Sequence, residues 1–332
     1  MKRASLTFAL LFLATASPRA SAQNALSPPV FKSGDTFFYR VYLKIDRDIK
    51  TISTLSLPQT PTQAKLDVLG ILQVEVLPSD AAAPTGAVRL RTWFLTLASD
   101  ISIRPRDRKP GDASADTNVQ RIPTANKFID CTLTAAGEIE QIAGLDALAP
   151  EQQQAWREWA TRFSAAFLIA TEKHKRGDKW SSDEPEATPS PIAELRWQKK
   201  FHYIHDEPCA LLKFTRSGEF QRASSSDSCA AIVSTATLLQ KSSPKDSTPA
   251  DYKQRNLRTS GTAGGTNDVL LSISRKNGQL VRATQNATQK MDALIVLADG
   301  STQVHYNVTA TATSSVELVT DLPLILQPKS AK

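Results

Sequence analysis

The chain has few of the residues that usually mark an active site or a disulfide framework: its 332 residues include three cysteines and four histidines. Three cysteines allow at most one intramolecular disulfide, so the fold must depend mainly on an apolar core. The sequence also lacks a nucleophile elbow, a phosphate-binding loop and a dinucleotide fingerprint. It therefore predicts no catalytic residue, cofactor or metal site, and whether the protein is an enzyme stays open because scattered side chains can assemble a hydrolase.

Concentrated positive charge is also absent. The sequence has 40 basic and 33 acidic residues, a formal net charge of +7. Loss of Lys2, Arg3 and Arg19 with an N-terminal signal would leave 37 basic residues. A nucleic-acid-binding surface needs clustered basic residues, usually with aromatic stacking platforms. The one basic run, at positions 104–109, is interrupted by Asp107 and indicates a solvated loop. We expect no nucleic-acid partner.

Long apolar runs are missing except at the start. Lys2 and Arg3 precede the apolar stretch Leu6–Ala14, and small residues follow at Ala20–Ala22, which is the pattern of a secretory signal peptide cleaved before Gln23. The apolar stretch is about half the length needed to span a bilayer, and no later segment is long enough. The sequence predicts a signal peptide over 1–22 and a secreted or periplasmic mature protein without an integral membrane segment.

The chain is rich in apolar residues at every second position. In the first such segment, the apolar residues mostly alternate, with Arg40, Lys44 and Asp46 on the opposite face, which is typical of a half-buried strand. The apolar residues are Phe37, Tyr39, Val41, Leu43 and Ile45. The same pattern occurs in Leu66–Leu77, Ala193–Tyr203, Ala210–Phe214, Met291–Leu297 and Thr302–Ala312. Tight turns are expected at Gly137, Asn277-Gly278 and Asp299-Gly300. We predict a mainly β (α+β) fold whose antiparallel strands form a curved sheet, half-barrel or sandwich.

One segment follows a helical period instead. Between Pro150 and Thr171, Trp156, Trp159, Phe163 and Phe167 recur at intervals of three and four residues. Pro150 suits the first turn of a helix. The aromatic stripe predicts burial against the sheet, with a ligand or partner face as the alternative.

Two similar units are indicated by comparing the chain with itself. The turn Gly34-Asp35 recurs as Gly177-Asp178, 143 residues later. Gly137, after an expected strand Lys127–Leu133, recurs 141 residues later as Gly278, after an expected strand Val269–Ser274. We expect a first β repeat over 23–148, a connecting amphipathic helix over 149–172, a second β repeat over 173–320 and a C-terminal tail over 321–332.

The cysteines and histidines lie mainly in the second unit. Cys209 and Cys229 flank an expected strand and hairpin, so they are the favoured disulfide pair, whereas Cys131 is in phase with apolar neighbours and is expected to be a buried thiol. His202 and His205 are three apart on an expected strand, which would place them on opposite faces and argues against a metal site.

Four polar stretches rich in Pro, Ser, Thr, Lys and Asp are expected to be solvated loops. They are Leu57–Gln63, Arg104–Asp116, Ser181–Pro191 and Ser242–Asp251.

With the Gly34 and Gly177 openings, the alternating strands and the Gly137 and Gly278 turns in view, the chain resembles a family of uncharacterised exported β-rich proteins of bacteria, a domain of unknown function. That resemblance implies a cell-envelope location and supplies no active site. The expected architecture is also similar to periplasmic lipoprotein-carrier half-barrels, which implies an apolar face that holds acyl chains.

Three functions follow as hypotheses. In the first, the two repeats cover each other and the protein is a non-catalytic binding or interaction module of the cell envelope. In the second, they leave a groove and the protein is a periplasmic carrier of an apolar or lipid ligand. In the third, the protein is a hydrolase whose site cannot be recognised in the sequence. The partner is accordingly an envelope protein or an apolar ligand.

Overall fold

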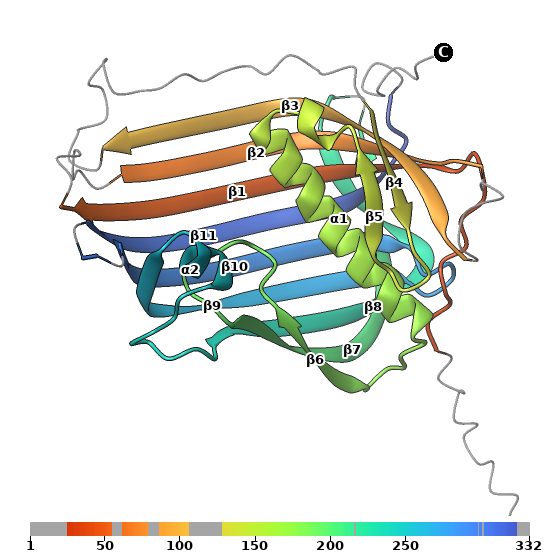
Figure 1. The fold of residues 1–332 in the computed structure, drawn as a ribbon. Coiled ribbons are helices and arrows are strands. Elements are labelled where there is room, and N and C mark those ends of the chain that lie inside the picture. Colours follow the sequence, from red (N-terminus) through yellow and green to blue (C-terminus); the bar gives the residue numbers. More distant parts are fainter. Residues whose placement is uncertain are drawn as a thin grey trace, which may run out of the picture.

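The strands form one large sheet. The computed structural model describes residues 25–54, 62–78, 86–105, 128–215, 217–297, 299–300 and 302–323. Within these ranges eleven strands occur in the spatial order β5-β4-β3-β2-β1-β11-β10-β9-β8-β7-β6, and consecutive neighbours are antiparallel (Figure 1). The mainly β, antiparallel prediction is therefore confirmed, and the arrangement is one continuous sheet instead of a two-sheet sandwich.

The strands fall into two groups along the chain. The first five are β1 Thr36–Ser53, β2 Thr62–Val76, β3 Val88–Pro105, β4 Phe128–Leu133 and β5 Ile139–Ala143. The next six are β6 Lys179–Pro185, β7 Leu195–Phe214, β8 Phe220–Gln240, β9 Leu257–Ser274, β10 Leu280–Leu297 and β11 Gln303–Thr320. The helices are a 3-10 turn at Leu145–Ala147, α1 at Pro150–Thr171 and α2 at Ala250–Gln254. The first strand joins the two groups because β1 pairs with β11 over sixteen residue pairs, from Phe38↔Val319 to Ser53↔Val304.

The helix α1 lies between the two groups in sequence and covers one face of the sheet, here called the inner face. It crosses this face diagonally, and β4 and β5 turn out of the plane of the long strands beside it (Figure 1). Its bounds match the predicted helical segment. The aromatic stripe is buried: Trp156 and Trp159 are 1% and 0% exposed, and Phe163 stacks on Trp159 with ring centroids 5.0 Å apart. Burial against the sheet is thus the arrangement that the structure shows.

The N-terminal residues complete this core. Leu26 is buried and its backbone N–H donates to the carbonyl of His174, just beyond the C-terminal end of α1. Phe31 packs against the rings of Phe163 and Phe167 at centroid distances of 5.8 and 6.1 Å. The expected signal peptide, residues 1–22, lies outside the described residues.

The opposite, outer face is covered at one end by the hairpin of β7 and β8. The end of β7 folds back until Leu212 pairs with Val319 of β11, in a short parallel contact that closes a ring of strands and departs from the antiparallel prediction. Leu212 and Val319 form a small apolar cluster with Ile71 and Leu322. Leu322 belongs to the expected C-terminal tail, so the first part of that tail packs on the sheet.

The structure joins Cys209 to Cys229 in a disulfide within this hairpin, the pair that the sequence favoured. Both cysteines are buried and pack with Val281 of β10. The crosslink ties the two strands at the point where the register of β7 shifts after Pro208.

Two of the predicted loops need correction. Ser181–Pro185 forms most of β6, because its residues pair with 196–200 of β7, and the loop begins only after Pro185. The stretch Ser242–Asp251 is not simply solvated, since Ser247 is 0% exposed and donates its backbone N–H to the carbonyl of Thr259. The other two predicted loops, Leu57–Gln63 and Arg104–Asp116, are described only in part. Residues 62–63 lie in β2 and residues 104–105 in β3, whereas 57–61 and 106–116 lie outside the described residues.

The two Gly-Asp turns have the same geometry. Gly34 and Gly177 have φ angles of 88° and 91°, a region that favours glycine. In both turns the aspartate carboxylate accepts a hydrogen bond, at 2.8 Å, from the backbone N–H of the residue three positions earlier. The glycine N–H donates to a backbone carbonyl of a neighbouring strand, also at 2.8 Å. The likeness supports the proposal of two β repeats, 23–148 and 173–320. The turns Thr134–Glu138 and Thr215–Glu219 also share one hydrogen-bond pattern, but their spacing differs from that of the Gly-Asp turns, so a shared turn does not by itself establish a repeat.

The thiol chemistry gives a first testable prediction. Cys131 is 3% exposed, and burial raises the pKa of its thiol to about 12, so roughly one thiol in ten thousand is ionised at pH 8. We expect no thiol to react with a disulfide reagent in the folded protein. Unfolding in urea without reductant should expose one thiol per chain, and reduction should expose three. Three reactive thiols before reduction would contradict the Cys209–Cys229 bond.

Candidate functional site

The inner face continues beyond α1 as an apolar surface with small side chains. Along β11, Val308, Ala310 and Ala312 point to the inner side, while Thr309 and Thr311 are exposed on the outer side. Equivalent inner positions on the neighbouring strands are the apolar Ile45, Leu66, Ala287 and Met291. These residues are only partly buried. The strand partners of Ala310 on this face are polar, Arg47 of β1 and Gln289 of β10. The strand alternation thus places an incompletely covered apolar surface on the side that carries α1.

Two hollows lie along one flank of α1. The first, about 180 Å³, lies between Glu151 and Gln154 of the helix and the apolar residues Ile45, Leu66 and Ile103 of the sheet. Ile103 is 55% exposed. The second, about 310 Å³, lies between the next turns of the same flank, at Thr161, Arg162 and Ala165, and residues of β7 to β10. Its sheet-side lining is Trp197, Lys199, Phe201, Ser234, Ala236, Asn267, Val269, Leu271 and Gln289.

A polar contact between the hollows fixes the helix to the sheet. The Ser314 hydroxyl of β11 donates to Glu158 Oε1 at 2.6 Å, and Arg162 Nε donates to the same oxygen at 2.7 Å. All three side chains are largely buried. Because positions 151, 154, 158, 161 and 165 follow a helical spacing of three and four residues, both hollows border one stripe of α1. We call the two hollows and the surface between them the inner-face furrow.

The loop after β6 bounds the other side of the furrow. Ile192 packs with Leu195, Leu238 and Ala293, and Ser190 Oγ lies 3.7 Å from the sulfur of Met291. Within the same loop, Glu186 accepts a hydrogen bond from Trp197 Nε1 at 2.7 Å. The furrow therefore has a helix on one side, a loop on the other and a mainly apolar floor, with the polar Lys199, Asn267 and Gln289 in its second hollow.

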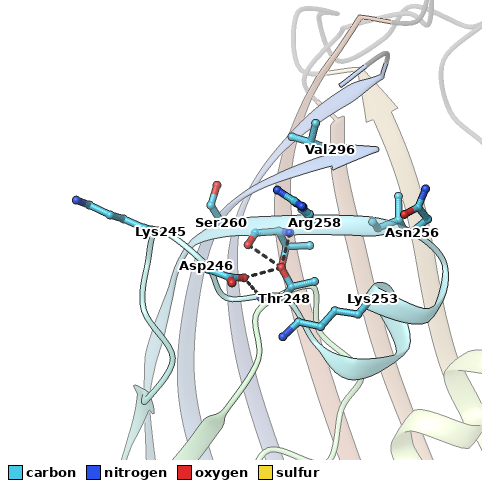
Figure 2. Close-up of a pocket in the computed structure, with 10 residues that line it drawn as sticks. Lys245, Asp246, Thr248, Lys253, Asn256, Arg258, Ser260 and Val296 are labelled. Carbon is cyan, nitrogen blue, oxygen red and sulfur yellow. Dashed lines mark hydrogen bonds between the residues drawn. The ribbon is translucent and has the colours of Figure 1, made fainter. Parts of the chain in front are cut away.

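A separate polar cavity of about 590 Å³ lies between the β8–β9 connection and the ends of β9 and β10 (Figure 2). Asp246 accepts the Thr248 hydroxyl at 2.8 Å, which is the largest cause lowering the pKa of its carboxyl group. Lys245, Lys253 and Arg258 line the cavity as exposed side chains, as Figure 2 shows. Because exposed charges are screened by salt, the cavity is a weak candidate for a specific site.

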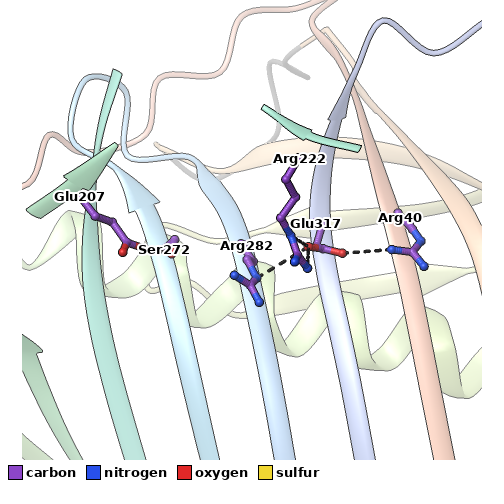
Figure 3. A network of polar contacts seen from close by, with 6 residues as sticks. All are labelled: Arg40, Glu207, Arg222, Ser272, Arg282 and Glu317. Atoms are coloured by element: carbon purple, nitrogen blue, oxygen red, sulfur yellow. Dashed lines mark hydrogen bonds and ion pairs between the residues drawn. The ribbon is translucent and has the colours of Figure 1, made fainter. Parts of the chain in front are cut away.

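A third feature is an arginine-rich network on the outer face (Figure 3). Arg40 of β1, Arg222 of β8 and Arg282 of β10 surround the carboxylate of Glu317 on β11, whose side chain is 3% exposed. Sequence reasoning missed these residues. They lie up to 277 positions apart, and each resembles an ordinary outward-facing residue in an alternating strand.

The residues predicted from the sequence do not form one site. Cys209 and Cys229 lie in the disulfide, and the four aromatic residues of the helical stripe are in the core beside Tyr39, with at most 8% exposure. In this conformation the stripe is not an accessible ligand or partner face. The opposite flank of α1, which the sequence analysis did not single out, borders the furrow instead.

His202 and His205 lie on one face of β7, whereas their spacing predicted opposite faces. A register shift between Tyr203 and His205 places His202 opposite Val233 and His205 opposite Ala231, which share one face of β8. The two histidines therefore occupy the same face, because the bulge adds one residue to the strand. Within the described ranges, no group of three or more His, Cys, Asp or Glu side chains is arranged to hold a metal ion.

None of the helices in the described residues combines the length and the apolar character that a membrane span requires.

Comparison with known proteins gives no family. No protein-family model matches this chain, and no curated protein does either. A solved structure of lipovitellin, described by its lipid–protein interactions, is 11% identical with a TM-score of 0.36, and a mutant of the Rh. blastica porin is 10% identical with a TM-score of 0.19. The lipovitellin match covers 87% of this chain and 25% of that one, and the porin match covers 84% and 99%. This chain thus spans about a quarter of the lipovitellin chain, and both TM-scores are too low to carry an inference.

Proposed function

We propose that this protein is a non-catalytic binding module of the cell envelope whose inner-face furrow takes an apolar chain, such as the acyl chain of a lipid. The observation that carries the proposal is the partly buried row of Ala310 and Ala312 beside Ile45, on the same side of the sheet as α1. Apolar surface that stays partly in water is stabilised by roughly 25 cal/mol per Å² when a ligand covers it.

The polar groups along the furrow support binding over catalysis. Arg162 and Ser314 both donate to Glu158, and Lys199 forms an ion pair with Glu184. Side chains that satisfy each other in this way orient a ligand at the rim of a mostly apolar site. An exported, oxidising location fits the disulfide, because such bonds persist outside the cytoplasm.

The proposal is tested by placing a charge on the floor of the furrow. Ala312→Lys introduces an ammonium group beside Ile45, and we expect it to weaken binding of a fluorescent fatty acid at least about tenfold, or about 1.4 kcal/mol. The cost arises because the charge must be desolvated when an apolar chain covers it. The measurement is a fluorescence titration of the secreted chain, followed by displacement with palmitate.

Thr311→Lys is the matched control. Thr311 is the next residue on the same strand and is exposed on the outer face. This variant should bind the probe as the unchanged protein does. Absence of probe binding in the unchanged protein, or equal binding in both variants, would reject the furrow as an apolar site.

A further inference from the structure

The arginine network on the outer face carries more positive charge than its one carboxylate can neutralise. Glu317 Oε1 accepts from Arg222 Nη2 at 2.6 Å and from Arg222 Nε at 3.0 Å, and Glu317 Oε2 accepts from Arg40 Nη1 at 3.3 Å. Arg282 Nε is 3.7 Å from Glu317 Oε1, an ion pair without a hydrogen bond. Three guanidinium groups thus meet one carboxylate, an excess of two positive charges.

The side chain of Arg222 is 50% exposed, but the other two cations are not simply surface charges. The side chains of Arg40 and Arg282 are 27% and 30% exposed, and Glu317 is 3% exposed. The Nε atoms of both arginines are buried and have no hydrogen-bond partner among the described residues. Arginine stays protonated at any physiological pH, so the excess cannot be relieved by proton loss. Partly buried cations with unsatisfied donors are unfavourable unless an anion compensates them.

A second carboxylate on this face, that of Glu207, already has partners. Glu207 accepts the hydroxyl of Ser272 at 3.1 Å and lies 3.6 Å from His205 Nε2. Ser272 is the strand partner of Arg282, and Figure 3 shows Glu207 beyond it, on the side away from Glu317. Glu207 therefore does not replace the missing counter-charge at Arg282.

We propose that Arg40, Arg222 and Arg282 bind a phosphate group, either free or as part of a lipid headgroup. A phosphate group carries a charge of about −1 to −2, which matches the excess of two. Guanidinium groups recognise its oxygens through paired N–H donors. Arg222 lies near the start of β8, in the hairpin that folds over the outer face, whereas Arg40 lies on β1 and Arg282 on β10. The anion would therefore also tie the hairpin to the sheet. The site is on the face opposite the furrow and does not rest on the proposed apolar ligand.

The test is calorimetric titration of the secreted chain with inorganic phosphate at fixed ionic strength. We expect saturable binding of one phosphate per chain. Arg282→Gln should weaken it about tenfold, or about 1.4 kcal/mol. This variant removes one cation without removing a hydrogen bond to Glu317, so the fold should be kept. Absence of saturable binding, or unchanged affinity in Arg282→Gln, would overturn the proposal.

Arg91→Gln is the control matched for exposure. Arg91 is also 30% exposed, but it forms two hydrogen bonds with Asp130 alone, at 2.7 and 2.8 Å. Its replacement should leave phosphate binding unchanged, and an equal loss in this variant would show that the effect is not local. As a second variant, Glu317→Gln removes the competing carboxylate and should bind phosphate more tightly, so weaker binding there would count against the site.

Two further titrations separate the sources of the phosphate. Short-chain phosphatidic acid in its soluble, monomeric form should bind more tightly than inorganic phosphate if the group belongs to a lipid. Inorganic phosphate should bind at least as tightly if the group is free. In both cases Arg282→Gln should weaken binding, whereas the Ala312→Lys furrow variant should leave it unchanged. If each ligand binds Arg282→Gln as tightly as it binds the unchanged protein, the arginines do not form the site.

Discussion

Trp159→Ala is expected to lower the free energy of unfolding by about 3–5 kcal/mol. Trp159 is 0% exposed at the centre of α1 and contacts the rings of Trp156, Phe163 and Tyr39 at centroid distances of 5.9, 5.0 and 6.3 Å. Removal of the indole leaves a cavity between the helix and the sheet, which close packing does not refill. Equilibrium unfolding in urea measures the change from the shift of the midpoint at an unchanged slope.

Two variants on the same helix serve as controls. Leu168→Ala, at a side chain that is 40% exposed, should cost about 1 kcal/mol or less. Trp159→Phe should cost less free energy of unfolding than Trp156→Phe. The Trp159 indole N–H has no hydrogen-bond partner in the described part of the chain, whereas Trp156 Nε1 donates to Thr92 Oγ1 at 2.9 Å. If Trp159→Ala costs no more than Leu168→Ala, the helix does not pack on the sheet as described.

The sequence predicted α1 and the apolar strands well because burial follows local spacing there. The helix has large aromatic residues at positions such as Trp156 and Phe163, and its bounds are Pro150–Thr171 as expected. In β1, every second residue from Tyr39 to Leu43 is buried, which is the alternation of the sequence. In both elements the inward side chains are large, so the period is visible without knowledge of the neighbours.

The strands β8 and β9 were largely missed because their inward residues are small. Ala236 and Ser234 of β8 point to the inner face beside α1, and the first half of β9 is rich in glycine, which is uncommon in strands. Only Val269–Ser274 was expected as a strand in this region, whereas β9 begins at Leu257. Small side chains suit these positions because α1 and the loop after β6 approach the sheet there. Such packing depends on distant parts of the chain.

Neither candidate site could be predicted from local sequence. The furrow needs the flank of α1 at Arg162 to face Asn267 of β9, more than a hundred residues away. The arginine network needs the β7–β8 hairpin to fold over β11, so that Arg222 reaches Glu317. Each side chain follows its own strand or helix pattern, and only the tertiary arrangement shows which polar residues meet.

Gly261→Ala is expected to destabilise the protein by about 3 kcal/mol, from backbone strain of about 1–3 kcal/mol and overpacking of similar size. Gly261 has a φ of 140°, which residues with a Cβ rarely adopt. A Cβ there would lie 2.0 Å from the carbonyl oxygen of Asp292 and 2.9 Å from Ala293 Cα. Both atoms belong to the backbone of β10, so neither can move without disturbing the sheet.

The position also joins β9 to the segment that precedes it. Gly261 donates its N–H to Pro244 O at 2.8 Å and accepts from Gln240 Nε2 at 3.1 Å. Gly264→Ala, three residues further along β9, is the control: its nearest neighbour would be Leu238 O at 3.8 Å, an ordinary contact. We expect that change to stay within about 1 kcal/mol of the unchanged protein in urea unfolding. Equal effects at both glycines would mean that β9 and β10 do not approach as closely at Gly261 as the structure shows, because only the Gly261 substitution meets backbone atoms.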